Sequence, residues 1–162
     1  MKRQGEIDLA LLLPRAADNS YKGKPFARYF FYLITAVTII RSCIHILAPD
    51  GGAQSIATIP LDSYSPPAAA AVVYLFAVWG LSQLLLGSLY LVVCIRYRSF
   101  IPLMYLTVFI EYSTRIVIGW SKPVTILGTA PGALMNYVMA PLALVLMLLS
   151  MIRSSGVHRQ RR

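Results

Sequence analysis

Apolar residues along this chain run in four long stretches, and short polar segments separate them. The stretches cover about residues 29–47, 68–95, 100–120 and 131–152. An α-helix needs about 20 mostly apolar residues to cross roughly 30 Å of hydrocarbon, and each stretch is long enough. The pattern therefore predicts an all-α membrane protein, built as a bundle of four transmembrane helices.

Proline and glycine residues mark where the predicted spans begin and end. Pro66 and Pro67 suit the start of a helix, and Pro102 is tolerated in a first turn, while PDGG closes the first span. We expect residues 1–25 to be a mobile or surface-lying tail, residues 26–152 the transmembrane domain, and residues 153–162 a basic tail. The long loop at 48–67 is expected to be a connector with partial packing, and a lid over the bundle is the alternative.

The composition and the positions of the charges support a membrane location. The chain is 57% hydrophobic and 13% charged, against about half and a quarter in soluble domains. Its net charge of +9 comes mainly from the two tails and the hinge RYRS, whereas the loop at 48–67 has no Lys or Arg and the last loop has only Lys122. Basic residues stay on the cytoplasmic side, so both termini are predicted to be cytoplasmic in a multi-pass protein of the inner (plasma) membrane.

The basic tails indicate contact with the lipid bilayer and no binding of nucleic acid. Lys and Arg near a membrane surface are attracted to anionic headgroups. Between the tails there is no recognition helix and no basic groove with stacking residues, which a nucleic-acid site would need.

Polar residues within the spans fall at a similar depth on all four predicted helices. Counting about 1.5 Å per residue from the outer ends places them roughly 8–14 Å deep, in the outer half of the bilayer. Ionisable residues in spans usually face the bundle interior, so we expect one shared polar layer. Its predicted members are Arg41, His45, Tyr74, Glu111, Tyr112, Arg115 and Asn136. The same count places Trp79 and Gln83 deeper, near the midplane, where they would line an inward extension of a cavity.

The charges in this layer do not balance. Glu111 is the single acid within the spans and faces Arg41 and Arg115. Glu111 and Arg115 have the favourable order for an ion pair along one helix. The remaining arginine would attract an anion, which could be a lipid phosphate, a carboxylate ligand, or Asp50 or Asp62 of the loop. The structural alternative is that Glu111 satisfies both arginines while their side chains reach toward the surface.

Neither a metal site nor a cofactor is predicted. Cys43 and Cys94 lie far apart inside apolar runs, with no CxxC or Cys/His spacing. Buried cysteines of this kind act as small apolar residues. His45 has no second His or Cys placed to complete a ligand set, and we expect a hydrogen-bonded histidine at a helix end.

The sequence resembles the small bacterial four-span membrane proteins of the DoxX-like kind. The likeness lies in WGLSQLLLGSLYLVV of the second span, the basic hinge RYR and the charged EYSTRIVIG of the third span, and it covers about residues 28–120. The resemblance implies a four-helix bundle and membership of a group that includes accessory subunits of membrane oxidoreductases. The redox-active members use cysteine pairs that this chain lacks, so no catalytic residue is carried over.

Three hypotheses of function follow from the polar layer. The first is a non-enzymatic binding or accessory module that holds a lipid-like or small anionic ligand, or contacts a membrane-protein partner or another copy of itself. The second is an enzyme acting on a lipid or isoprenoid, with Glu111 and His45 as acid and base. The third is a small oligomeric transporter, which the apolar residues below Gln83 and Thr107 count against.

Overall fold

The computed structural model describes residues 6–154, and within them the chain is helical. Its four long helices are α1 (Pro25–Leu47), α2 (Pro66–Arg96), α3 (Ile101–Ser121) and α4 (Pro131–Met151). All four are long and apolar enough to cross a membrane. The structure thus confirms the predicted all-α architecture of four such helices. Three short 3-10 turns, at Leu9–Leu11, Leu61–Ser63 and Arg98–Phe100, lie in the connecting segments.

Each long helix has a proline at its first or second position. Proline is favoured there because its missing N–H has no partner within the helix in any case, and its fixed φ suits the helical backbone. The first helix starts four residues before the predicted span, because the aromatic segment after Pro25 continues the helix beyond the apolar core.

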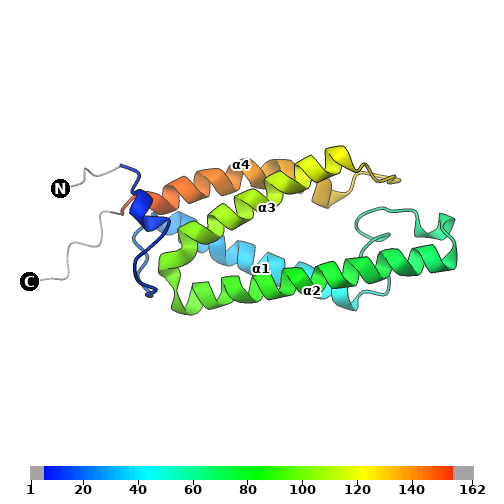
Figure 1. Ribbon diagram of the computed structural model, residues 1–162, viewed down its shortest axis with the longest axis horizontal. Coiled ribbons are helices and arrows are strands. Elements are labelled where there is room, and N and C mark those ends of the chain that lie inside the picture. The colour runs from blue at the N-terminus through cyan, green and yellow to red at the C-terminus, as the bar shows by residue number, and fades with distance from the viewer. Residues whose placement is uncertain (1–5, 155–162) are drawn as a thin grey trace, which may run out of the picture.

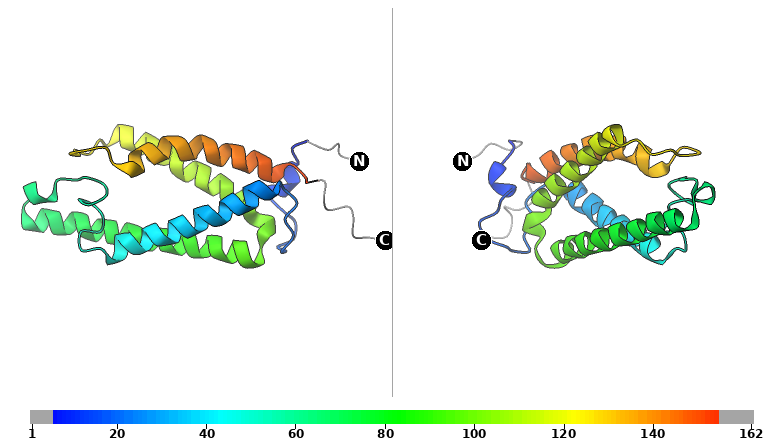
Figure 2. Two further views of the ribbon diagram at one scale, coloured as in Figure 1. Left: turned by 180° about the vertical axis from the view of Figure 1, so that it is seen from behind. Right: turned by 45° about the vertical axis from the view of Figure 1, so that its right-hand side comes forward.

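The helices pack as two antiparallel pairs, α1 with α2 and α3 with α4 (Figure 1). The pairs converge at the end of the bundle that carries residues 6–24, 97–100 and 152–154, which we call the terminal end. They diverge toward the end that carries residues 48–65 and 122–130, which we call the loop end (Figure 2).

An aromatic core holds the two pairs together near the terminal end. The ring of Phe31 lies 5.3 Å from that of Tyr90 and 5.4 Å from that of Tyr105, so α1, α2 and α3 meet there. The hydroxyl of Tyr105 donates to the backbone carbonyl of Ala27 at 2.6 Å. Leu146 of α4 is also fully buried in this cluster. Burial of such large side chains supplies most of the packing energy available to this half of the bundle.

Residues 6–24 fold across the terminal end of the bundle. Asp8 is buried, at 2% exposure, and its carboxylate accepts two hydrogen bonds from the Arg153 guanidinium, at 2.9 and 2.7 Å. Ile7 forms a β-bridge with Ile152. The described part of the predicted tail is therefore packed against the bundle, and both described ends of the chain lie on one side of it. Residues 1–5 and 155–162, which complete the two predicted tails, lie outside the described residues.

The loop between α1 and α2 packs on α2 and also reaches the other helix pair. Ala53, Ile59 and Leu61 form a small core against Val72, Val73 and Phe76. Thr58 accepts a hydrogen bond from the backbone N–H of Leu127 at 2.9 Å and donates its hydroxyl to the carbonyl of Gly128 at 3.3 Å. The loop is thus a packed connector that also joins the two pairs at the loop end.

Candidate functional site

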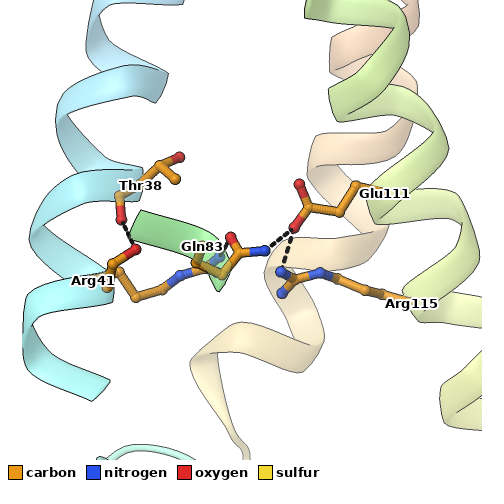
Figure 3. A network of polar contacts seen from close by, with 6 residues as sticks. Thr38, Arg41, Gln83, Glu111 and Arg115 are labelled. Atoms are coloured by element: carbon orange, nitrogen blue, oxygen red, sulfur yellow. Dashed lines mark hydrogen bonds and ion pairs between the residues drawn. The ribbon is translucent and has the colours of Figure 1, made fainter. Parts of the chain in front are cut away.

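Three helices place charged and polar side chains at one level, in the loop-end half of the bundle (Figure 3). Arg41 and His45 lie one turn apart on α1, Trp79 and Gln83 one turn apart on α2, and Glu111 and Arg115 one turn apart on α3. Side chains four residues apart share a helix face, so each helix contributes a pair to the same layer. The close approach of α1 and α2 brings two of these pairs together.

Glycine in α2 allows that close approach. A Cβ at Gly80 would lie only 2.7 Å from the Cβ of His45, and one at Gly87 would lie 3.0 Å from Cγ1 of Ile39. Small residues let helix backbones approach closely in membranes, where lipid provides no hydrophobic force to press helices together. The local sequence of α2 therefore fixes the position of Trp79 and Gln83 against α1.

A chain of hydrogen bonds crosses from one helix pair to the other. Arg41 donates to Oε1 of Gln83 at 3.0 Å, and Nε2 of Gln83 donates to Oε1 of Glu111 at 2.9 Å. Arg115 forms an ion pair with the same oxygen of Glu111. Gln83 is 8% exposed, so its amide is a buried link between the two arginines. Glu111 is therefore paired with Arg115, and Arg41 is bonded to a neutral amide.

Trp79 lies at the centre of the layer. The guanidinium carbon of Arg41 is 5.6 Å from the centroid of its ring, and that of Arg115 is 4.9 Å from it. Arg115 also lies over the ring of Tyr112, at 5.3 Å. Cations within about 6 Å of an aromatic ring are attracted to its negative quadrupole, so both arginines interact with the same ring.

His45 holds the first loop in place. Its side chain is 4% exposed, and its Nδ1 lies 2.7 Å from the carbonyl of Gly51, so this nitrogen is the donor. The imidazole ring packs 4.6 Å from the ring of Trp79. Within residues 6–154, His45 bonds to the first loop whereas Glu111 bonds to Gln83 and Arg115, so the two side chains of the enzyme hypothesis have separate partners.

Two predicted members of the layer are not joined to it. Tyr74 is 68% exposed on α2, and Asn136 is half-buried with no hydrogen bond to another described residue. Trp79 and Gln83, which were expected deeper, are instead at its centre. The reason is that α2 extends beyond α1 at the loop end (Figure 1), so depths counted from its start are too large. The i,i+4 spacing of Trp79 and Gln83, on the face next to Gly80, is the sequence signal that marks them.

The carboxylates of the first loop do not neutralise Arg41. Asp50 accepts hydrogen bonds from the backbone N–H groups of Gly52, Gln54 and Ser55, and Asp62 accepts one from the side chain of Gln54. Burial opposes ionisation of Asp50, but these N–H donors outweigh it and lower its pKa to about 2. The carboxylates of Asp50 and Asp62 thus accept their hydrogen bonds from within the loop.

The layer therefore carries two arginines and one carboxylate among the described residues, and the Nε of Arg41 is buried without a hydrogen-bond partner. No group of three or more His, Cys, Asp and Glu side chains suited to hold a metal occurs within residues 6–154. Both cysteines are free thiols. The arrangement is suited to attracting and orienting an anion.

Comparison of the chain with models of protein families, with curated protein sequences and with solved structures finds no match, so the geometry of the layer is the basis for a functional assignment.

Proposed function

We propose that the chain is a multi-pass protein of the inner membrane with both termini in the cytoplasm, and that it is a binding or accessory module. Its polar layer, formed by Arg41, Trp79, Gln83, Glu111 and Arg115, binds an anionic group of a lipid-like or small molecule. The single observation that carries this proposal is the unbalanced positive charge of Arg41, which is bonded to an uncharged amide.

Burial of the Arg41 guanidinium has an energetic cost. A charge in a low-dielectric interior is expensive unless an opposite charge or several hydrogen bonds compensate it. Gln83 supplies one acceptor to Arg41, and Trp79 adds a cation–π contact. A bound anion would offset the remaining cost of burying the Arg41 charge, because it supplies a negative charge and further hydrogen-bond acceptors.

The geometry favours a carboxylate or phosphate as that anion. A guanidinium presents planar N–H groups that match these anions in a bidentate manner. Because Arg41 and Arg115 both lie against the Trp79 ring, one anion can be attracted by both. A small soluble ligand and a lipid headgroup share this chemistry. A membrane-protein partner or a second copy that inserts a carboxylate would also supply it.

Fluorescence of Trp79 tests the proposal directly. The chain has two tryptophans, so Trp120→Phe leaves Trp79 as the single reporter. The purified protein in detergent is titrated with inorganic phosphate and, separately, with dodecyl phosphate, which distinguish a soluble anion from an anionic amphiphile. We expect a saturable change, weakened at least tenfold by Arg41→Gln, because a hydrogen bond to a charged group contributes about 1.5–3 kcal/mol.

The matched control is Arg96→Gln, which removes an exposed arginine at the terminal end. This variant should bind as the parent does. Mass spectrometry of molecules that co-purify in native lipid discs identifies the natural ligand. The absence of a fluorescence response to both probes, together with no co-purifying anion, would contradict the proposal.

A further inference from the structure

A second concave surface lies on the lipid-facing side of α1 and α2, toward the terminal end. It is a groove of about 620 Å³, within the range of ligand pockets. Its body is apolar, and the residues that form it include Ala36, Ile39 and Ile40 of α1 and Leu91 and Ile95 of α2. Arg98 and Tyr32 line the same groove. The polar layer, in contrast, lies in the loop-end half of the bundle.

The groove exists because α1 and α2 separate. Gly80 and Gly87 let them touch toward the loop end, and the contact of Gly87 with Ile39 is the last of these close approaches. Beyond Gly87, α2 has no further glycine, and its buried positions carry larger side chains such as Tyr90 and Val93. The two helices diverge in that direction (Figure 2). The groove is lined by residues of both helices on this side of Gly87.

The guanidinium of Arg98 lines one part of this groove. Arg98 lies two residues beyond the last residue of α2, and its Nε donates to the carbonyl of Cys94 at 3.1 Å. This bond orients the guanidinium. Within residues 6–154 its terminal N–H groups have no hydrogen-bond partner, and no carboxylate forms an ion pair with it. Because α2 ends here, the charge lies where the hydrocarbon meets the polar surface of the membrane.

A second arginine adds positive charge at the same end of α1. Arg28 lies one turn before Tyr32, so the two share a helix face. The Nε of Arg28 is buried and has no hydrogen-bond partner among the described residues. Tyr32 and Arg98 thus line the groove with donors, while Arg28, whose guanidinium donates to the hydroxyl of Tyr29 at 2.9 Å, adds positive charge one turn away.

We propose that this groove binds one acyl chain of an anionic phospholipid from the leaflet at the terminal end, with the lipid headgroup at Arg98 and Tyr32. The apolar body matches the chain, and the arginines match the negative headgroup. Anionic headgroups attract nearby Lys and Arg side chains, and a guanidinium binds phosphate through paired hydrogen bonds. The inference does not rest on the proposed function, since it involves other residues at the other end of the bundle.

Native mass spectrometry of the full-length protein tests this site. The protein in detergent is offered equal amounts of phosphatidylglycerol and phosphatidylcholine with identical acyl chains. We expect a bound lipid with a preference for phosphatidylglycerol. Arg98→Gln should reduce that preference at least severalfold, whereas Arg96→Gln, an exposed arginine outside the groove, should preserve it.

A second variant tests the apolar body independently of the charge. Ala36→Phe fills the groove from the lipid-facing side of α1 and leaves Arg98 in place, so it should lower binding of both lipids. If Arg98→Gln does not fold, Ala36→Phe decides the matter. The proposal is overturned if no lipid is retained, or if Arg98→Gln and Arg96→Gln show the same preference. It is also overturned if Ala36→Phe leaves lipid binding intact, or if it instead breaks up a dimer, which would show that a second copy occupies the groove.

Discussion

At the residue scale, Gln83 is the side chain that connects the two helix pairs within the polar layer. A primary amide can accept from Arg41 with its oxygen and donate to Glu111 with its nitrogen at the same time, and the two bonds measure 3.0 and 2.9 Å. A leucine of similar size can do neither. The amide thus joins a cation to an anion without supplying charge itself.

Replacing this amide should cost stability. Gln83→Leu leaves Arg41 and Glu111 each without one buried partner, so we expect a loss of about 1–3 kcal/mol in the free energy of unfolding. Chemical unfolding in detergent measures it. Ser82→Ala is the matched control, since Ser82 is exposed and bonds only to the carbonyl of Val78. Equal stability of the two variants would contradict the account.

Sequence reasoning identified the charged members of the layer but not its centre. Arg41, Glu111 and Arg115 stand out because charges are rare in hydrocarbon. Tyr74 and Asn136 were included from their depth alone, and depth does not decide which way a side chain points. The sequence also does not show which arginine pairs with Glu111. Gln83 lies between Arg41 and Glu111, and its position depends on how closely α1 and α2 pack.

At the element scale, the contact between α1 and α2 depends on Gly80. A methyl group there would meet the Cβ of His45 at 2.7 Å, and neither atom is the end of a flexible side chain. The helices would have to move apart, and Trp79 and Gln83 would move with α2.

Gly80→Ala should therefore destabilise the protein by about 1–3 kcal/mol, as overpacking does. Gly119→Ala is the matched control, because nothing lies within 4 Å of the added methyl group and alanine favours the helix. Thermal unfolding in detergent should show a lower midpoint for Gly80→Ala and an unchanged or higher one for Gly119→Ala. A neutral Gly80→Ala would show that this contact does not position α2.

The first loop is held by hydrogen bonds to the Asp50 carboxylate, so its stability should decrease at low pH. The pKa of Asp50 is lowered to about 2, so its carboxylate stabilises the folded loop above the ordinary pKa of 3.8 and loses this effect as the pH falls toward 2. We expect the stability advantage of the parent over Asp50→Asn to be full at pH 7 and to shrink between about pH 4 and pH 2. Unfolding midpoints measured across this range test it, and a constant difference would contradict it.

At the scale of the whole molecule, the four spans follow from the sequence, because the length of an apolar run and the positions of prolines are local properties. The divergence of the two helix pairs does not, because the large aromatic side chains that join the pairs meet only near the terminal end. Both described ends of the chain lie at one end of the bundle, as an even number of spans requires. The DoxX-like resemblance and the cytoplasmic location of the termini stay predictions.

The packing of residues 6–24 at the terminal end could not be predicted from the sequence either. It depends on a contact between residues 145 positions apart. Asp8 is buried against Arg153. Arg153→Met removes the two hydrogen bonds that this carboxylate accepts from the guanidinium, and it should loosen the segment. Limited trypsin digestion should then cut after Arg15 or Lys22 faster than in the parent or in Arg96→Gln. Equal rates would show that the ion pair does not hold the segment.

Glu111→Gln tests the unbalanced charge of the polar layer most directly. The substituted amide retains hydrogen-bonding groups for Gln83 and Arg115 but removes the negative charge that competes with a bound anion. A unit charge about 8 Å away contributes roughly 2 kcal/mol at an effective dielectric constant of about 20. In the Trp120→Phe background, titration of the Trp79 fluorescence with phosphate should show binding about tenfold tighter or more for Glu111→Gln than for the parent. Unchanged or weaker binding would contradict the account.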